Sequence, residues 1–153
     1  MTKATISTEI GDIDIDLYTQ AAPKAAQNFI DLAKKGFYDD VIFHRVIPGF
    51  VIQGGDGEFG KKASLNSGRV GTGGPGYKIK CETKGNPRTH EVGALSMAHA
   101  GKDTGGSQFF MVLSEDNTRH LNGVHTVFGQ IKTGLDVMQK IVKNDVMNSV
   151  RVS

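Results

Sequence analysis

The feature that most restricts the fold of this chain is a series of short apolar runs separated by glycine-rich turns. In the run at 10–17, isoleucine and leucine alternate with aspartate, a pattern typical of a strand with one buried side and one solvent-facing side. The 20 glycines among 153 residues supply the turns that such a chain requires. Further strands are expected within 43–55 and at 92–99, 107–113, 124–131 and 146–152.

Helical periodicity occurs in two segments. The first, 21–35, has Pro23 at a position where a first-turn proline is tolerated, and Gly36 follows it as a C-terminal stop. The second, 133–144, is expected to begin with Thr133 as its N-cap. Many strands with two isolated helices favour a mainly β chain, folded as a closed or nearly closed antiparallel barrel with helices over its ends. The length fits a single domain over residues 1–153.

Composition and charge argue against several function classes. A formal net charge of +2 is too small to indicate nucleic-acid binding by field strength. The single cysteine, Cys81, cannot form an internal disulfide, and no apolar run approaches the length of a membrane span. The N-terminus lacks the apolar core of a signal peptide. We therefore expect a cytoplasmic protein, monomeric and without a membrane or nucleic-acid partner.

Motifs for phosphate, metal and covalent chemistry are incomplete. The glycines at 55–61 have P-loop spacing, but Lys62 stands where serine or threonine should hold magnesium. The glycines at 71–76 precede a β-like run, whereas a dinucleotide fingerprint requires a helix start. The aspartates at 12–16 lack the glycine and glutamate of a calcium loop, the histidines lack metal spacing, and no serine lies in a Gly-x-Ser-x-Gly elbow. We expect no metal and no cofactor.

One segment, 43–55, places a charged side chain beside bulky apolar ones. Side chains of a strand alternate between faces, so Val51 and Gln53 share a face, and Arg45 shares it too if the turn at 48–49 preserves register. A guanidinium directed at an apolar surface is costly unless it has a partner or a function. The residues alone leave two interpretations, an arginine paired with a surface carboxylate and an arginine that acts on a ligand.

Three long motifs in this sequence resemble those of a known family. They read Tyr38-x-x-Val41-x-Phe43-His44-Arg45-Val46-Ile47-x-x-Phe50-Val51-x-Gln53-Gly54-Gly55, then Leu95-Ser-Met-Ala98-x-Ala100-Gly101 with Gly106-Ser107-Gln108-Phe109-Phe110, then Leu121-Asn-Gly-x-His125-x-Val127-Phe128-Gly129. In this order, and over nearly the whole chain, they resemble the motifs of the cyclophilins, which are peptidyl-prolyl cis-trans isomerases. The resemblance implies a closed eight-stranded antiparallel barrel capped by two α-helices.

The resemblance also implies an activity and its residues. It implies catalysed rotation of Xaa-Pro peptide bonds in proline-containing peptides and unfolded proteins, assisting protein folding without a covalent intermediate or cofactor. Arg45 is then the catalytic donor to the prolyl nitrogen. The substrate-binding residues that it implies are His44, Phe50, Val51, Gln53, Gly71, Ala98, His99, Ala100, Gln108, Phe110, His120, Leu121 and His125. Of these, His44 is expected to point away from the face of Arg45, because it is the next residue of the strand.

Three positions depart from the common family pattern. Val51 stands where many members have methionine, His99 replaces a common asparagine, and His120 occupies a position often held by tryptophan. Because many members use that tryptophan to hold cyclosporin, the resemblance implies weakened affinity for cyclosporin-type inhibitors. The loop 58–69 is also longer than in compact members and carries Lys61, Lys62 and Arg69. Two alternative functions remain open, a proline-peptide binding module and an RNA-associated chaperone that uses this basic loop.

Overall fold

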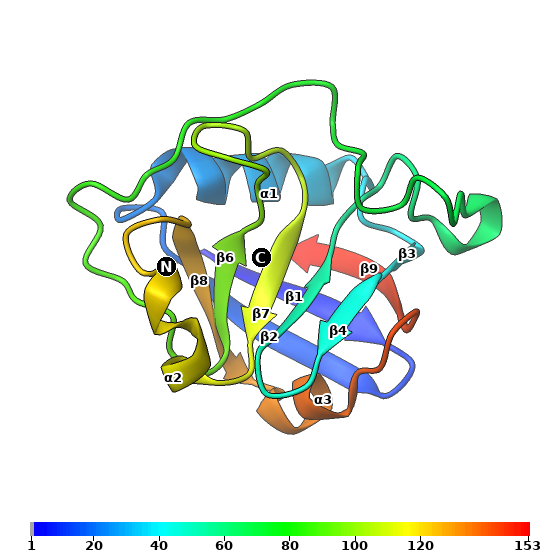
Figure 1. Cartoon of the computed structure of the whole chain (residues 1–153). Helices are drawn as coiled ribbons and strands as arrows, with labels where there is room; N and C mark the ends of the chain where they lie inside the picture. The colour runs from blue at the N-terminus through cyan, green and yellow to red at the C-terminus, as the bar shows by residue number, and fades with distance from the viewer. Residues whose placement is uncertain (1) are drawn as a thin grey trace.

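A computed structural model of the protein describes residues 2–153 (Figure 1). Within these residues the strands form one antiparallel sheet of nine strands in the order β3-β9-β1-β2-β8-β6-β7-β5-β4. The strands are β1 (Lys3–Thr8), β2 (Gly11–Leu17), β3 (Val41–Ile42), β4 (Arg45–Ile47), β5 (Val51–Gly54), β6 (Ala94–Met97), β7 (Phe109–Val112), β8 (Val127–Thr133) and β9 (Val146–Val152). The helices are α1 (Pro23–Lys34), α2 (Glu115–Thr118) and α3 (Leu135–Lys140), with short 3-10 turns η1 (Lys62–Ser64) and η2 (Arg119–Leu121).

The sheet is open, and the expected closed eight-stranded barrel is wrong in this respect. Its two edge strands, β3 and β4, are consecutive in the chain but are not paired with each other. Between them, the backbone N–H of Phe43 donates to the carbonyl of Asp145 (2.8 Å), and its carbonyl accepts from Asn144 (2.9 Å). The sheet therefore curls without closing, because a turn of the chain, and not another strand, satisfies the backbone at this point.

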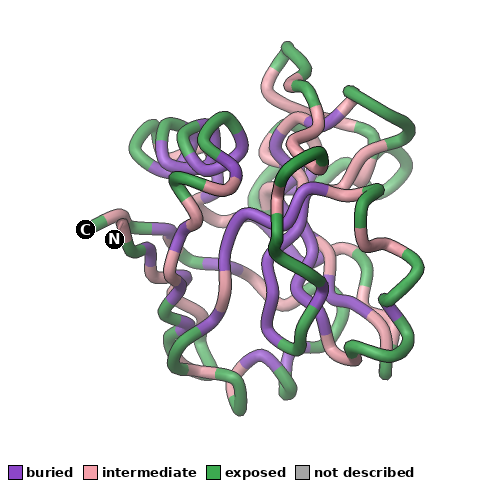
Figure 2. The backbone as a smooth tube through the Cα atoms, turned by 90° about the vertical axis from the view of Figure 1, so that its left-hand side faces the viewer, coloured by how far each residue is buried: buried purple, intermediate pink, exposed green. Residues whose placement is uncertain are grey.

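The inner side of the curled sheet holds the main core, and α1 covers one end of it (Figure 1). Fully buried side chains of β1 and β2 such as Ile6, Ile13 and Ile15 alternate with exposed or half-buried neighbours, as the sequence pattern predicts. The ring of Phe29 on α1 lies 5.4 Å from that of Phe109, edge to face. Figure 2 shows buried and exposed residues alternating around the turns of α1, which identifies its core-facing side.

The first helix is confirmed within the predicted segment, and its N-terminus has a cap from elsewhere in the chain. Pro23 lies in the first turn, and no side chain of the N-cap residue bonds to the helix. Instead the carboxylate of Glu82 accepts from the backbone N–H groups of Lys24 (3.1 Å) and Ala25 (2.7 Å). A negative charge at this end also complements the helix dipole. This contact attaches the long segment between β5 and β6, which contains Glu82, to α1.

The second helix is shorter than predicted. Thr133 is the last residue of β8 and not an N-cap, because its hydroxyl donates to the carboxylate of Asp14 (2.6 Å). The helix α3 begins after Gly134, which has a φ of 96°, a conformation that favours glycine. It ends at Lys140, since Ile141 is already extended. The short helix α2 was not predicted, because four residues carry no readable periodicity.

The long segment between β5 and β6 is organised by one buried carboxylate. In Figure 1 it is the cyan-to-green trace that passes over the end of the sheet near α1. Asp56 is 0% exposed and accepts from the backbone N–H groups of Glu58, Phe59, Gly71 and Gly73. Four such bonds to one carboxylate fix a loop that would otherwise have little regular structure.

Two of the three basic residues within 58–69 have intramolecular roles. The Nζ of Lys61 donates to the carbonyl of Asp39 at 2.7 Å, just beyond the end of α1. The guanidinium of Arg69 lies over the ring of Phe59, 4.5 Å from its centroid. These contacts weaken the alternative of an RNA-binding loop, because they engage charges that the alternative needs free for phosphates.

Candidate active site

The site is built on the outer face of the sheet. Arg45 pairs with Gln53, Gln53 pairs with Phe110, and Phe110 pairs with Ser96 across four neighbouring strands. Residues directly opposite in antiparallel strands project to the same face, so this row crosses β4, β5, β7 and β6 on one side. The intervening residues Ile52 and Met111 project into the inner core. The structure thus brings Arg45, Val51 and Gln53 to one face, as the strand pattern predicts.

A second apolar cluster occupies this outer face. We call it the outer cluster, and its buried members are Val51, Ala94, Phe110, Val112 and Val127. Val51 is 3% exposed and Phe110 is 4% exposed, although both lie on the side of the sheet away from the inner core. Partly exposed residues pack against it and form its boundary with solvent: Tyr18, Phe50, Ala98 and Leu121. Strands with both faces covered explain the continuous apolar run at 109–113.

A directed series of hydrogen bonds connects Arg45 to the long loop. The Nη1 of Arg45 donates to the Oε1 of Gln53 (3.4 Å), and the Nε2 of Gln53 donates to the Oε1 of Gln108 (3.1 Å). The Nε2 of Gln108 then donates to the carbonyls of Gly71 and Gly73, both at 2.9 Å. Arg45 itself is exposed, and no carboxylate within residues 2–153 forms a salt bridge with it. The interpretation of a paired surface arginine is therefore wrong.

An open groove of about 890 Å³ lies beside the outer cluster. It takes in six of the predicted site residues, Gln53, Gly71, Ala98, His99, Ala100 and Gln108. The remaining lining residues come mostly from the long loop: Glu58, Thr72, Gly73, Gly74, Pro75, Gly76, Tyr77, Lys78, Thr104, Gly106 and Ser107. Arg45 and the apolar residues of the outer cluster are not part of its lining. Most of the predicted site residues therefore fall into two adjoining places, the outer cluster and the groove, which share Ala98.

Tyr77 and Asn28 support the groove, and neither was predicted from the sequence. The side chain of Asn28, on α1, donates to the carbonyl of Gly106 (2.7 Å) and accepts from the hydroxyl of Tyr77. Asn28 thus connects α1 to two residues that line the groove, Tyr77 and Gly106. An asparagine on an otherwise apolar helix face is the signal that could have indicated this, because a buried amide needs partners.

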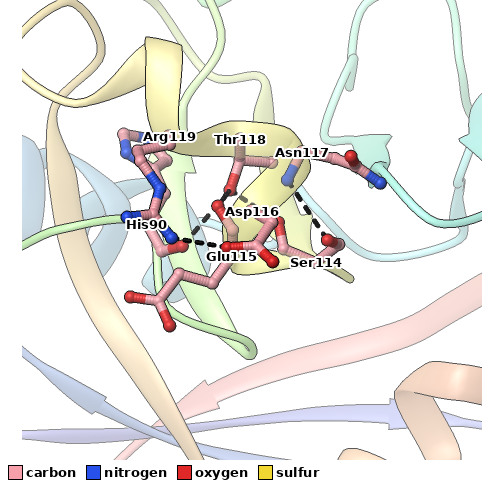
Figure 3. A network of polar contacts seen from close by, with 7 residues as sticks. All are labelled: His90, Ser114, Glu115, Asp116, Asn117, Thr118 and Arg119. Carbon is pink, nitrogen blue, oxygen red and sulfur yellow. Dashed lines mark hydrogen bonds and ion pairs between the residues drawn. The ribbon is translucent and has the colours of Figure 1, made fainter.

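His90 packs against Phe110 of the outer cluster. Its ring stacks on Phe110 (5.7 Å between centroids), and its nitrogens contact Asn122 (2.6 Å) and Ser96 (2.9 Å). Figure 3 shows how α2 is fastened to it, with the hydroxyl of Thr118 directed at the backbone carbonyl of His90. Burial lowers the pKa of His90 below its ordinary value, and the hydrogen bond to Asn122 opposes this shift.

His99 and His125 form a stacked pair at the edge of the outer cluster. Their ring centroids are 4.0 Å apart with an interplanar angle of 11°, and His125 meets Phe110 edge to face at 5.5 Å. Burial lowers the pKa of His125, while its hydrogen bond to the carbonyl of Met97 acts in the opposite direction.

The two remaining histidines lie at separate places. His44 packs against Gly71, where an added Cβ would lie 3.2 Å from its Nε2, and it lines no part of the groove. Burial lowers the pKa of His44, against a raising effect from Asp56. His120 is exposed and stacks on Phe50, with 6.0 Å between centroids and an interplanar angle of 8°.

Residues 2–153 contain neither a cluster of metal ligands nor a helix that could span a membrane. No group of three or more histidine, cysteine, aspartate or glutamate side chains is arranged to hold a metal ion there. The alternating aspartates are used otherwise, since Asp14 accepts from two threonine hydroxyls and Asp16 contacts Lys3 and Lys132. None of the helices described in this range has the length and apolar character needed to cross a bilayer.

Comparison with known proteins identifies the family. A family model described as "Cyclophilin type peptidyl-prolyl cis-trans isomerase/CLD" matches residues 3–153. Peptidyl-prolyl cis-trans isomerase B of Bacillus subtilis is 58% identical over 140 residues, which cover 92% of this chain and 90% of that protein. A peptidyl-prolyl cis-trans isomerase of Helicobacter pylori is 50% identical over 149 residues, covering 96% of this chain and 84% of that protein.

Solved structures of the same family have a similar fold. A cyclophilin type peptidyl-prolyl cis-trans isomerase of Cryptosporidium parvum has a TM-score of 0.84 and 29% identity, covering 99% of this chain and 97% of that chain. A second crystal structure of that protein was determined in the presence of the dipeptide Ala-Pro, with a TM-score of 0.83. Because the family model spans almost the whole sequence and the relatives are similar over most of their length, the chain belongs to the cyclophilin-type peptidyl-prolyl cis-trans isomerases.

Proposed function

We propose that this protein catalyses rotation about Xaa-Pro peptide bonds with Arg45 as the donor to the prolyl nitrogen and the outer cluster as the seat of the proline ring. One observation carries the assignment: Arg45 is held by Gln53 on the same sheet face as an apolar cluster that is only partly covered. Phe50, Val51, Phe110, Leu121 and His125 contact the ring in this proposal. Gln53, Gln108 and the backbone of 98–100 hold the flanking peptide, which extends along the groove past Gly71.

The chemistry requires only a change in hydrogen bonding. Resonance in the amide gives a rotation barrier of about 18–20 kcal/mol, because it delocalises the nitrogen lone pair. As the bond twists, the lone pair returns to nitrogen and becomes a hydrogen-bond acceptor. A guanidinium directed at that nitrogen binds the twisted state more strongly than either planar isomer, which lowers the barrier by about 2–4 kcal/mol. No covalent bond forms or breaks.

The substitution Arg45→Ala tests this proposal. We expect the exchange rate of an Xaa-Pro model peptide, measured by NMR exchange spectroscopy, to fall by about 30- to 1000-fold, because about 2–4 kcal/mol of transition-state stabilisation is removed. Peptide affinity should stay close to that of the wild type. Arg151→Ala is the matched control, since Arg151 pairs with Asp39 on another side of the sheet.

Parallel losses of affinity and exchange rate in Arg45→Ala would instead favour a proline-peptide binding module. The RNA-associated chaperone has weaker support, because Lys61 and Arg69 are engaged within the loop. Salt-dependent retention of RNA that disappears on removing Lys61, Lys62 and Arg69 would restore that alternative.

The partners and location form part of the same proposal. We expect the substrates to be proline-containing peptides and unfolded proteins, and the protein to act as a cytoplasmic monomer. Cyclosporin-type inhibitors should bind more weakly than to family members with tryptophan in place of His120, because a smaller ring that already stacks on Phe50 offers less apolar contact. An inhibition titration that gives equal affinity for this protein and a tryptophan-bearing member would contradict this expectation.

A further inference from the structure

The stacked pair of His99 and His125 lies where the outer cluster meets the groove. The rings of His99, His125, Phe110 and His90 follow one another in contact, with centroid separations of 4.0, 5.5 and 5.7 Å. His125 therefore lies between the side chain of His99 and the phenyl ring that we assign to proline binding. Any change in the position of His99 is passed on to His125 directly.

Hydrogen bonds determine which ring nitrogens carry a proton in the neutral pair. The Nδ1 of His125 lies 2.8 Å from the carbonyl of Met97, and the Nε2 of His99 lies 3.1 Å from the carbonyl of Val124. A carbonyl only accepts, so both of these nitrogens donate. The free lone pair is then on Nε2 of His125 and on Nδ1 of His99. Within residues 2–153, the buried Nδ1 of His99 has no hydrogen-bond partner.

A second proton on either ring therefore meets an unfavourable environment. A proton on Nδ1 of His99 would be a buried donor without an acceptor, and charges on both rings would repel across 4.0 Å. When both rings are neutral, there is no unpaired buried donor and no repulsion between charges. Stacking in the present geometry is therefore favoured at neutral pH and opposed at acidic pH.

Among residues 2–153, the groups that shift the pKa of His125 include no carboxylate. The titratable groups that influence the pKa of His125 are His99, His90 and His120, which lie in the segments after and before β6 and in η2. On the neighbouring loop, the carboxylate of Asp103 accepts from the backbone of Cys81, and on α2 the carboxylate of Asp116 pairs with Arg119. On the strand side, β7 contributes the apolar Phe110, and the exposed guanidinium of Arg45 on β4 adds to the positive charge of this face.

We propose that His99 is a positioning residue that holds His125 against the outer cluster while both rings are neutral, so that acidification weakens peptide binding at this site. The inference rests on the proposed function, because it concerns the same proline-binding surface. It differs in assigning a role to the side chain of His99, whereas the family resemblance implies a contact through the backbone.

The test compares KM and kcat for an Xaa-Pro peptide at pH 8.0 and pH 5.5 by NMR exchange spectroscopy. For the wild type we expect KM to rise about three- to tenfold on acidification with a smaller change in kcat, because positioning and not the donor is affected. In His99→Phe, which keeps a flat ring without a titratable group, the ratio of the two KM values should fall to below about twofold. His99→Tyr serves as a second flat-ring variant if the first does not fold.

Two further variants separate positioning from other roles. His99→Asn removes the stack, so KM should be raised at both pH values. His120→Phe removes another histidine of the same face but keeps a ring beside Phe50, and the KM ratio of the wild type should persist in it. Circular dichroism at pH 5.5 verifies that each variant is folded.

An NMR titration gives a readout that does not depend on activity. In His99→Phe the pKa of His125 should rise relative to the wild type, because the charge of His99 that lowers it is absent. A flat-ring variant that keeps the full pH dependence of KM would overturn the role of His99, as would a wild-type KM that does not change with pH. Failure of the proposed function looks different, since the wild type would then show no exchange activity at pH 8.0.

Discussion

At the scale of single residues, the position of Arg45 depends on two glutamines that have no charge of their own. Gln53 accepts a hydrogen bond from the arginine and donates one to Gln108. The side-chain amide of Gln108 in turn donates to two backbone carbonyls of the loop. A guanidinium on a flexible stem would otherwise sample many orientations. The two glutamines are half-buried and uncharged. They therefore restrict the orientation of the Arg45 guanidinium without neutralising its charge.

The substitution Gln53→Leu should slow isomerisation more than it weakens binding. It removes the acceptor for Arg45 and the donor to Gln108 while keeping a similar volume. We expect kcat to fall by about 5- to 30-fold with a smaller change in KM, equivalent to about 1–2 kcal/mol for lost hydrogen bonds to a charged group. Gln27→Leu is the control, because the side chain of Gln27 donates to Asp31 on the exposed face of α1. Wild-type exchange kinetics in Gln53→Leu would show that Arg45 needs no such support.

At the scale of elements, the loop between β5 and β6 behaves as a structured part of the site. Its carbonyls at Gly71 and Gly73 hold Gln108, and the N–H groups of the same two glycines donate to Asp56. An added Cβ on Gly73 would lie 2.3 Å from the carboxylate of Asp56, so the close approach requires glycine at this position. The loop and the sheet are thus coupled through one buried charge and one amide.

The substitution Asp56→Asn tests this coupling. An asparagine offers one acceptor oxygen where the carboxylate offers two, so the N–H groups of either Glu58 and Phe59 or Gly71 and Gly73 lose their acceptor. We expect the free energy of unfolding, measured by urea denaturation, to fall by about 1–3 kcal/mol, because two part-buried donors lose their acceptor. Hydrogen exchange at Gly71 and Gly73 should also accelerate.

The control for this prediction is Asp12→Asn, on the exposed face of β2. An Asp56→Asn protein as stable as this control, with unchanged exchange at the two glycines, would mean that the carboxylate does not organise the loop. Asp56 itself could not be recognised from the sequence. In the primary structure it is one of several acids in a glycine-rich stretch, and its burial follows only from how the loop folds back.

At the scale of the whole molecule, one buried and two half-buried histidines make the stability depend on pH. Burial lowers the pKa of His44, His90 and His125 in the folded protein below the ordinary value of about 6.5. The unfolded chain therefore binds protons first as the pH falls through that value. Each histidine then shifts the equilibrium toward the unfolded state, and all three act in the same direction.

We expect the free energy of unfolding to be highest at and above about pH 7 and to decrease between about pH 6.5 and pH 5. Hydrogen bonds from Thr133 and Thr5 lower the pKa of Asp14, and its stabilising contribution is lost only below the ordinary carboxylate range. Urea denaturation at constant ionic strength from pH 5 to pH 8 measures the dependence. Thr133→Val should lower the stability at pH 7 without changing the slope between pH 5 and pH 6.5. A flat profile over this interval in the wild type would contradict the prediction.

The sequence by itself determined the approximate position of most strands, although not that of β1, and which family the chain resembles. Alternation predicted that Arg45, Val51 and Gln53 share a face, and the family resemblance named the motifs that hold them, because both depend on local order along the chain. Only the tertiary structure decided that the sheet stays open at Phe43, that Glu82 caps α1 and that His99 stacks on His125. Each of these contacts joins residues whose proximity is set by the packing of distant segments, and no local pattern encodes that packing.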